Sequence, residues 1–205
     1  MTRRRIIIPP FTAPALSLFA ATGATTTTFN PFDKSVNLDL SNGNLTVTEN
    51  AVTANGDLVR SIAHYPTGVY YAESTVDVFN NAYAVGPLVC NSSAILTNAP
   101  GDSVNGLSYD SDGHIRGNAG AININTGVTF GQGDRIGVEV DCSGRTFRVR
   151  VNGGAWSVLA DISFITGDLY YAVYCYNNVG NQITTNFGAT AYVDTPPATA
   201  VNWGN

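Results

Sequence analysis

Histidine, the side chain that most often moves protons in enzymes, occurs twice in this chain. His64 precedes Tyr65-Pro66 and His114 follows an Asp-Gly pair, so both are expected in loops. A serine or cysteine nucleophile needs a base within hydrogen-bond reach, and no Gly-x-Ser-x-Gly nucleophile motif is present. The sequence therefore predicts two locally hydrogen-bonded histidines and no nucleophilic catalysis.

The three cysteines, Cys90, Cys142 and Cys175, stand singly in the sequence. Without a Cys-x-x-Cys spacing they do not suggest a zinc site, and an odd number argues against a disulfide framework. Cys175 lies in the apolar run 170–176 and is expected to be a small buried hydrophobe. This cysteine usage is typical of a protein assembled in a reducing cytosol.

Two arrangements of acidic residues are candidates for metal binding or glycoside cleavage. Asp110-x-Asp112-Gly113 resembles the start of a calcium loop, but residues 114–122 contain no acid and Asp-Gly also forms tight hairpin turns. Glu73 and Glu139 fall on expected strands, yet neither belongs to the acid-rich strand pattern of many glycosidases. We therefore expect no metal, no cofactor and no enzymatic activity.

Composition excludes further classes of function. Charged residues make up 12% of the 205, about half the share of roughly 25% in ordinary domains, and the formal net charge is −5. A nucleic-acid groove needs clustered positive charge, which is absent here. No apolar run reaches the ~18 residues that a membrane-spanning helix needs. A surface made soluble by amides and hydroxyls is common in proteins packed against neighbours in large assemblies.

The elements that must position any site are strands, and residues 130–152 show this best. In this segment Ile136, Val138 and Val140 alternate with Gly137 and Glu139. The same alternation continues after the turn-forming residues 141–144, with Phe147, Val149 and Val151 apolar and Arg148 and Arg150 polar. A period of two predicts an antiparallel hairpin with its apolar set inward and Glu139, Arg148 and Arg150 outward.

Similar short strands recur at about 8–12 residue spacing along the chain, with turn residues between them and no helical pattern. Apolar content of 44% over this length is enough for a core. The sequence predicts an all-β fold, an antiparallel two-sheet β-sandwich.

Several of these strands also resemble the signature of the SPRY domain family. Blocks in the family's order cover 29–192. They are Gly68–Glu73, Ala84–Gly86, Ser108–Gly113, Gly131–Asp141 with Thr146–Gly154, Leu169–Val173 and Asn186–Gly188. Tyr171 stands where the family usually has proline, and Ala72 and Ser74 replace usual core residues. The resemblance implies a concanavalin A-like jelly roll with ligand loops at one end, and it is closest to SPRY-type bacteriophage virion proteins.

Residues 1–28 differ from the rest and are interpreted as an apolar N-terminal docking arm. Three arginines are followed by isoleucines and three prolines. A secretory signal peptide is the alternative, but prolines interrupt its apolar region. The arm residues expected to be buried on a partner are Ile6, Ile7, Ile8, Phe11 and Leu16. Residues 193–205 are expected to be a short tail that Trp203 pins to a surface.

Aromatic residues near strand ends are the candidate ligand contacts, because flat rings beside amides suit protein contacts and stack on sugars. The candidates are Tyr83, Tyr109, Trp156, Tyr176 and Asn177.

Two functions are consistent with this pattern. The first is a structural bacteriophage virion component, a head decoration, head fibre or tail protein assembled in the host cytoplasm. Its arm would tether it to other virion proteins in a homo- or hetero-oligomeric assembly. The second is a lectin-like module that recognises a host receptor or glycan.

Overall fold

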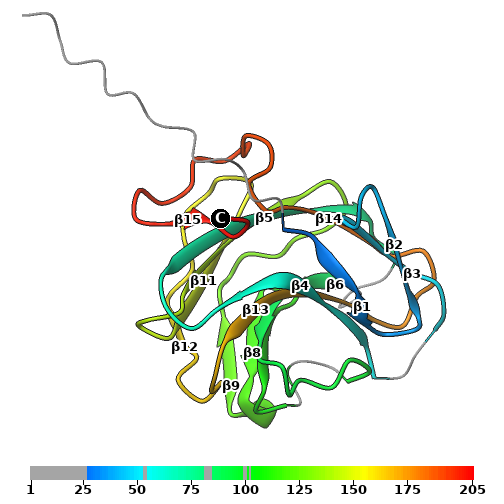
Figure 1. The fold of residues 1–205 in the computed structure, drawn as a ribbon, viewed down its shortest axis with the longest axis horizontal. Helices are drawn as coiled ribbons and strands as arrows, with labels where there is room; N and C mark the ends of the chain where they lie inside the picture. The colour runs from blue at the N-terminus through cyan, green and yellow to red at the C-terminus, as the bar shows by residue number, and fades with distance from the viewer. Residues whose placement is uncertain (1–26, 53–54, 81–84, 99–100, 102) are drawn as a thin grey trace, which may run out of the picture.

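A computed structural model describes residues 27–205 except 53–54, 81–84, 99–100 and 102, and two β-sheets packed face to face make up almost all of it (Figure 1). The seven-stranded sheet has the order β1-β4-β13-β6-β7-β8-β9. Its strands are β1 (Phe29–Lys34), β4 (Asp57–Tyr65), β13 (Leu169–Cys175), β6 (Val85–Cys90), β7 (Gly106–Tyr109), β8 (His114–Gly117) and β9 (Ile122–Asn125).

The eight-stranded sheet has the order β12-β11-β10-β5-β14-β3-β2, with β15 beside β5. Its strands are β12 (Ala160–Asp161), β11 (Thr146–Val151), β10 (Arg135–Asp141), β5 (Val69–Val78), β14 (Gln182–Asn186), β3 (Thr46–Glu49), β2 (Leu38–Ser41) and β15 (Val201–Asn202). Neighbouring strands pair antiparallel except β15, which is parallel to β5. Among the described residues helix is confined to short 3₁₀ stretches such as Asn118–Gly120, and none is long and apolar enough to cross a membrane. The predicted two-sheet sandwich is confirmed.

The hairpin of β10 and β11 has the register that its alternation predicts. Val138 lies opposite Val149, and Glu139 lies opposite Arg148. The apolar set is buried between the sheets, although Val151 at the strand end is only half-buried. On the outer face, Arg148 donates two hydrogen bonds to Glu139, at 2.8 and 2.9 Å, so the predicted cross-strand pair forms.

Two residues that depart from the usual family pattern, Tyr171 and Ser74, are hydrogen-bonded to each other in the core. Tyr171 is fully buried, and its hydroxyl lies 2.6 Å from Ser74 Oγ, which lies 2.7 Å from Thr185 Oγ1. Burial raises the pKa of Tyr171, so this hydroxyl stays protonated. A serine at position 74 thus gives the buried phenol a partner, which an apolar side chain could not do.

Residues 193–205, expected to be a short tail that Trp203 pins to a surface, add a strand to the second sheet. β15 pairs with Tyr70 and Tyr71 of β5 in the part of that strand that β14 does not reach. Trp203 then turns into the end of the sandwich, where it is fully buried against three tyrosine rings at 5.6–5.7 Å between centroids. Trp203 therefore holds the segment by completing the core and not by resting on a surface.

The sandwich has two lateral edges that lie on opposite sides of the molecule. At one edge, β1 of the first sheet lies beside β2 of the second. Figure 1 shows β11 and β12 on the opposite side from β1 and β2. Here the second sheet faces β7, β8 and the segment that follows β9, and the gap between the two sheets opens into a pocket.

Candidate functional site

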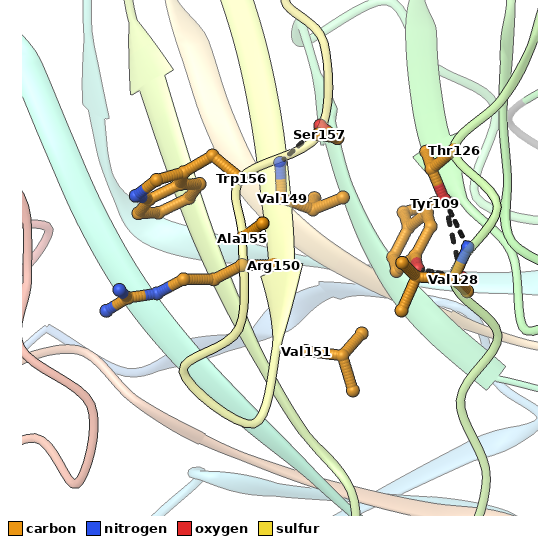
Figure 2. Close-up of a pocket in the computed structure, with 9 residues that line it drawn as sticks. All are labelled: Tyr109, Thr126, Val128, Val149, Arg150, Val151, Ala155, Trp156 and Ser157. Atoms are coloured by element: carbon orange, nitrogen blue, oxygen red, sulfur yellow. Dashed lines mark hydrogen bonds between the residues drawn. The ribbon is translucent and has the colours of Figure 1, made fainter.

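A pocket of about 100 Å³ lies at this edge, between β11 and β7. Figure 2 shows its two walls, one formed by β11 with the segment that follows it and the other by Tyr109 with residues 126–128. The lining residues are Tyr109, Thr126, Val128, Val149, Arg150, Val151, Ala155, Trp156 and Ser157. Most of these side chains present apolar atoms to the pocket.

The first wall is made by a chain reversal after β11. Asn152 and Gly153 adopt left-handed backbone angles, φ 50° and 68°, which Asn and Gly tolerate best. The chain then returns along the open edge of β11, where Ser157 N donates to Val149 O at 2.7 Å and Val149 N donates to Ser157 Oγ at 3.0 Å. These bonds hold Ala155 and Trp156 beside β11, and Figure 2 shows the Trp156 ring with Arg150 on the side of the strand that faces away from Tyr109 and Val128.

The second wall is held by the turn between β7 and β8. The hydroxyl of Tyr109 donates to Val128 O, and Thr126 Oγ1 donates to Gly113 O at 2.8 Å. Gly113 has φ 85°, and a Cβ there would lie 2.7 Å from Val128 O, so only glycine permits this approach. Val128 is therefore fixed beside the pocket although its side chain is 44% exposed.

Trp156 lies between two guanidinium groups on the outer face of β11. The Cζ atoms of Arg148 and Arg150 lie 4.7 and 4.6 Å from its ring centroid. Arg148 is fixed by Glu139, and Arg150 Nη2 donates to Thr195 O at 2.5 Å. Cation–π contacts of this kind orient an aromatic ring while leaving part of it exposed.

The two aspartates of the predicted turn form ion pairs with the same arginine. Arg116 Nη1 lies 2.5 Å from Asp110 Oδ2, and Arg116 Nη2 lies 2.5 Å from Asp112 Oδ2. Burial raises the pKa of Asp112, but the hydrogen bonds and charge of Arg116 outweigh it and leave that pKa below its usual value. Among the residues the structure describes, no three His, Cys, Asp or Glu side chains are placed to hold a metal ion.

The structure brings together two of the five sequence-predicted ligand residues. Trp156 and Tyr109 both line the pocket, and Tyr109 lies at the end of β7, as expected from its place before the turn. It is 1% exposed, and its ring packs 5.1 Å from the ring of Phe130. Tyr83, and all five arm residues (Ile6, Ile7, Ile8, Phe11 and Leu16), lie outside the described residues.

Tyr176 and Asn177 lie elsewhere, in the turn between β13 and β14. Tyr176 is half-buried against the outer apolar cluster of the seven-stranded sheet, and Asn177 is exposed in a left-handed conformation with φ 63°. The following residues of the turn are held by Glu49, whose Oε2 accepts hydrogen bonds from Asn178 N at 3.2 Å and Asn181 Nδ2 at 3.1 Å.

Glu49 itself is fully buried, and its other oxygen, Oε1, has no hydrogen-bond partner among the described residues. Burial raises the pKa of Glu49 above its usual value, against the lowering effect of the Asn181 and Asn178 hydrogen bonds. The folded chain therefore keeps a proton that the unfolded chain loses above about pH 4.3. Stability from this group falls as pH rises through the window between these two pKa values.

Replacing Glu49 by glutamine should remove this pH dependence. The variant keeps a carbonyl oxygen for Asn178 and Asn181 but carries no charge to desolvate. Its unfolding free energy relative to the natural chain should therefore rise between pH 4 and pH 8. Urea unfolding at both pH values measures the difference, and an equal difference at the two would show that folding does not change the pKa of Glu49.

The groups considered for catalysis are occupied or buried. The expectation of loop positions was wrong for both histidines, because His64 lies within β4 and His114 begins β8. His64 Nδ1 lies 2.8 Å from Asp168 Oδ2, and its ring is stacked on Tyr170. All three cysteines are buried, and burial raises the pKa of Cys90 and Cys142 to about 12. On the outer face of the eight-stranded sheet, Glu73 accepts hydrogen bonds from the backbone N–H groups of residues 193 and 194.

Sequence reasoning missed most of the pocket wall. The alternation correctly predicted that the side chains of Val149 and Val151 point inward. It does not show that a pocket opens beside them at this edge of the sandwich. Ala155 and Val128 gave no signal, because small or aliphatic residues in turn-rich segments are common. The available clue to the stacking of Trp156 was the pair Arg148 and Arg150, which share one face of a strand shortly before Gly153-Gly154-Ala155-Trp156.

Comparison with known proteins identifies the fold. Neither a protein-family model nor a curated protein matches this sequence. Among solved structures, the SPRY domain of human HERC1 is similar with a TM-score of 0.67 and 18% identity, covering 80% of this chain and 99% of that one. The TRIM65 PSpry domain (0.60, 14% identity, 78% and 88% covered) and a human SPRY domain (0.55, 15%, 76% and 98%) are also similar. The chain has the SPRY fold.

Proposed function

We propose that this protein is a non-enzymatic interaction protein, an accessory component of a bacteriophage virion, and that the pocket beside Trp156 binds a side chain of a protein partner. The observation that carries the proposal is the pocket itself. An aromatic ring fixed between two arginines lies next to an apolar depression, and Trp and Arg are enriched at the energetic centres of protein interfaces.

The size of the pocket favours a protein side chain over a free small molecule. Ligand pockets are usually about 300–1,000 Å³, whereas this one is about 100 Å³. The two guanidinium groups beside Trp156 already have protein partners, since Arg148 is paired with Glu139 and Arg150 donates to a backbone carbonyl. These features favour an apolar anchor from a partner over the polar ring of a glycan.

Burial of the candidate nucleophiles supports a binding role without catalysis. A thiol with a pKa of about 12 is almost entirely protonated at neutral pH and is a poor nucleophile. Glu139 is bound to Arg148 and Glu73 to two backbone amides, so neither carboxylate is free to act as an acid or base.

The virion assignment rests on the low charge of the chain, on its SPRY-type sequence blocks and on the apolar segment 1–28 as a tether. Quantitative mass spectrometry of virus particles purified from the producing host tests it. We expect this chain in the particles in several copies. A chain deleted of residues 1–20 should fold but be missing from them. Absence of the full chain from purified particles would overturn the virion role.

Replacing Trp156 by alanine tests the pocket. Loss of an interface hot spot costs about 2 kcal/mol or more of binding, roughly a thirtyfold weaker contact. The unfolding free energy should fall by only about 1–2 kcal/mol, because the half-buried ring loses two cation–π contacts. Occupancy in particles and urea unfolding measure the two effects.

Trp156→Phe is the matched variant for this test, since it keeps an aromatic ring between the arginines and should restore most of the occupancy. A stability loss of about 3–5 kcal/mol in Trp156→Ala with unchanged binding would show instead that Trp156 serves the core.

A further inference from the structure

The most exposed large apolar side chain described is Phe32, which is 97% exposed. It lies in β1, the outermost strand of the seven-stranded sheet. β1 pairs with β4 at Phe29 and at Lys34, and the register shifts between them. The four residues between these two positions therefore form an irregularity that carries Phe32 out from the edge of the sandwich.

This projection is held firmly by its neighbours. Phe32 N donates to Asn30 Oδ1 at 3.0 Å, and Pro31 fixes its own φ. Asp33 forms a bidentate ion pair with Arg60, at 2.7 and 2.6 Å, and Arg60 also donates to two backbone carbonyls of the segment after β6. A rigid support of this kind lowers the entropy lost when the ring is buried on a partner.

The pocket beside Trp156 has the size and chemistry to receive such a ring. A closed apolar cavity of about 150 Å³ in another protein holds a benzene molecule. An open depression of about 100 Å³ lined by Tyr109, Val128, Val149, Val151 and Ala155 fits most of a phenyl group. The surrounding edge is also apolar, with Val158 62% and Leu159 57% exposed.

The projecting ring and the pocket lie on opposite edges of the same sandwich. Phe32 is on the β1 edge, whereas the pocket is on the edge formed by β11 and the segment after β9 (Figure 1). They cannot meet within one molecule. A projection on one side that fits a depression on the other side defines a heterologous, head-to-tail contact between copies, which builds rings or open chains.

We infer that this protein associates with itself head to tail, with Phe32 of one copy inserted in the pocket beside Trp156 of the next copy. The inference rests on the proposed function, because it names a second copy of the chain as a partner of the same pocket. One aromatic side chain buries only roughly 150–250 Å², well below the ~1,000 Å² of a stable interface. The contact is therefore weak in free solution and is strengthened when many copies are tethered side by side.

Two complementary variants test the contact. Phe32→Ser removes the ring and keeps the pocket, whereas Ala155→Phe fills the pocket and keeps the ring. Ala155 is exposed, so this change should leave the fold intact. Neither variant should associate with itself, but the two should bind each other. Val128→Glu places a charge at a 44% exposed position on the rim of the pocket. It is a second pocket variant, to be used if Ala155→Phe does not fold normally.

The measurement is the amide spectrum of ¹⁵N-labelled Phe32→Ser titrated with unlabelled Ala155→Phe to about 1 mM. We expect shifts in residues 126–128 and 149–157, and with the labels exchanged, shifts in residues 30–36. Unlabelled Phe32→Ser added to labelled Phe32→Ser should give no shifts, because neither copy has the ring. Ile95→Ser, which removes another apolar side chain that is 60% exposed, is the control and should associate like the natural chain.

Each other outcome overturns the inference. Absence of shifts at 1 mM, with Val128→Glu as well as Ala155→Phe, would exclude the contact. Shifts in residues 30–36 on both partners would indicate a symmetric pairing of β1 edges instead. If the copies fail to bind each other but Trp156→Ala is still lost from particles, the self-association is wrong and the proposed partner-binding pocket stands.

Discussion

Replacing Trp203 by alanine is expected to lower the unfolding free energy by about 3–5 kcal/mol, a large part of the 5–15 kcal/mol of an ordinary domain. The indole is fully buried among Tyr65, Tyr70 and Tyr171, and its Nε1 donates to Ser61 Oγ and Ala63 O, both at 3.2 Å. Removing it opens a cavity at the end of the sandwich and releases β15. Urea unfolding measures the loss.

Val201→Ala is the matched control, because Val201 belongs to the same short strand but is 48% exposed. It should change the unfolding free energy by less than about 1 kcal/mol. Trp203→Phe should fall between the two variants. Similar small losses for Trp203→Ala and Val201→Ala would mean that the C-terminal segment is peripheral to the fold.

Replacing Arg60 by methionine should cost about 3–5 kcal/mol as well, the usual effect of removing one partner of a buried ion pair. The Arg60 side chain is 8% exposed and makes four hydrogen bonds, two to Asp33 and two to the carbonyls of Asn91 and Ala94. Methionine fills the space but leaves all of these acceptors without their donor. Thermal and urea unfolding measure the effect.

Arg145→Met is the control for this substitution. Arg145 donates to two carbonyls, of Ile165 and Gly167, and has no carboxylate within ion-pair distance among the described residues. Its loss should cost less than about 1.5 kcal/mol. Equal effects of the two substitutions would show that the Asp33–Arg60 pair contributes nothing beyond its hydrogen bonds to carbonyls.

The strands and their facing could be predicted because alternation is a local property. Ile136 to Val151 has the same register in the structure as in the sequence pattern, including the Glu139–Arg148 pair. The turn at Asp112-Gly113 was predictable for the same reason. Trp203 was not, because its neighbours Tyr65, Tyr70 and Tyr171 come from three distant segments and no short-range pattern reports their convergence.

The site was predicted only in part. An aromatic residue after Gly153-Gly154 suggested a contact, and Trp156 does stand at a pocket. Tyr109 has the same sequence setting, a tyrosine next to a turn, but its strand direction turns the ring inward. The exposure of Phe32 could not be predicted, because it depends on a shift in register between β1 and β4 that no local sequence pattern reports.

A photo-crosslinking amino acid at position 158 tests the central claim most directly, namely that the partner occupies the edge pocket. A benzophenone side chain replaces Val158, which is 62% exposed on the edge around the pocket, in one sample and Asn177, an exposed residue of the other candidate loop, in a second. Position 158 does not line the pocket, so the new side chain leaves it open. Both proteins are irradiated within assembled particles, and crosslinked peptides are identified by mass spectrometry. We expect efficient crosslinks from position 158 to a partner, and few from position 177. Crosslinks from position 177 alone would contradict the assignment.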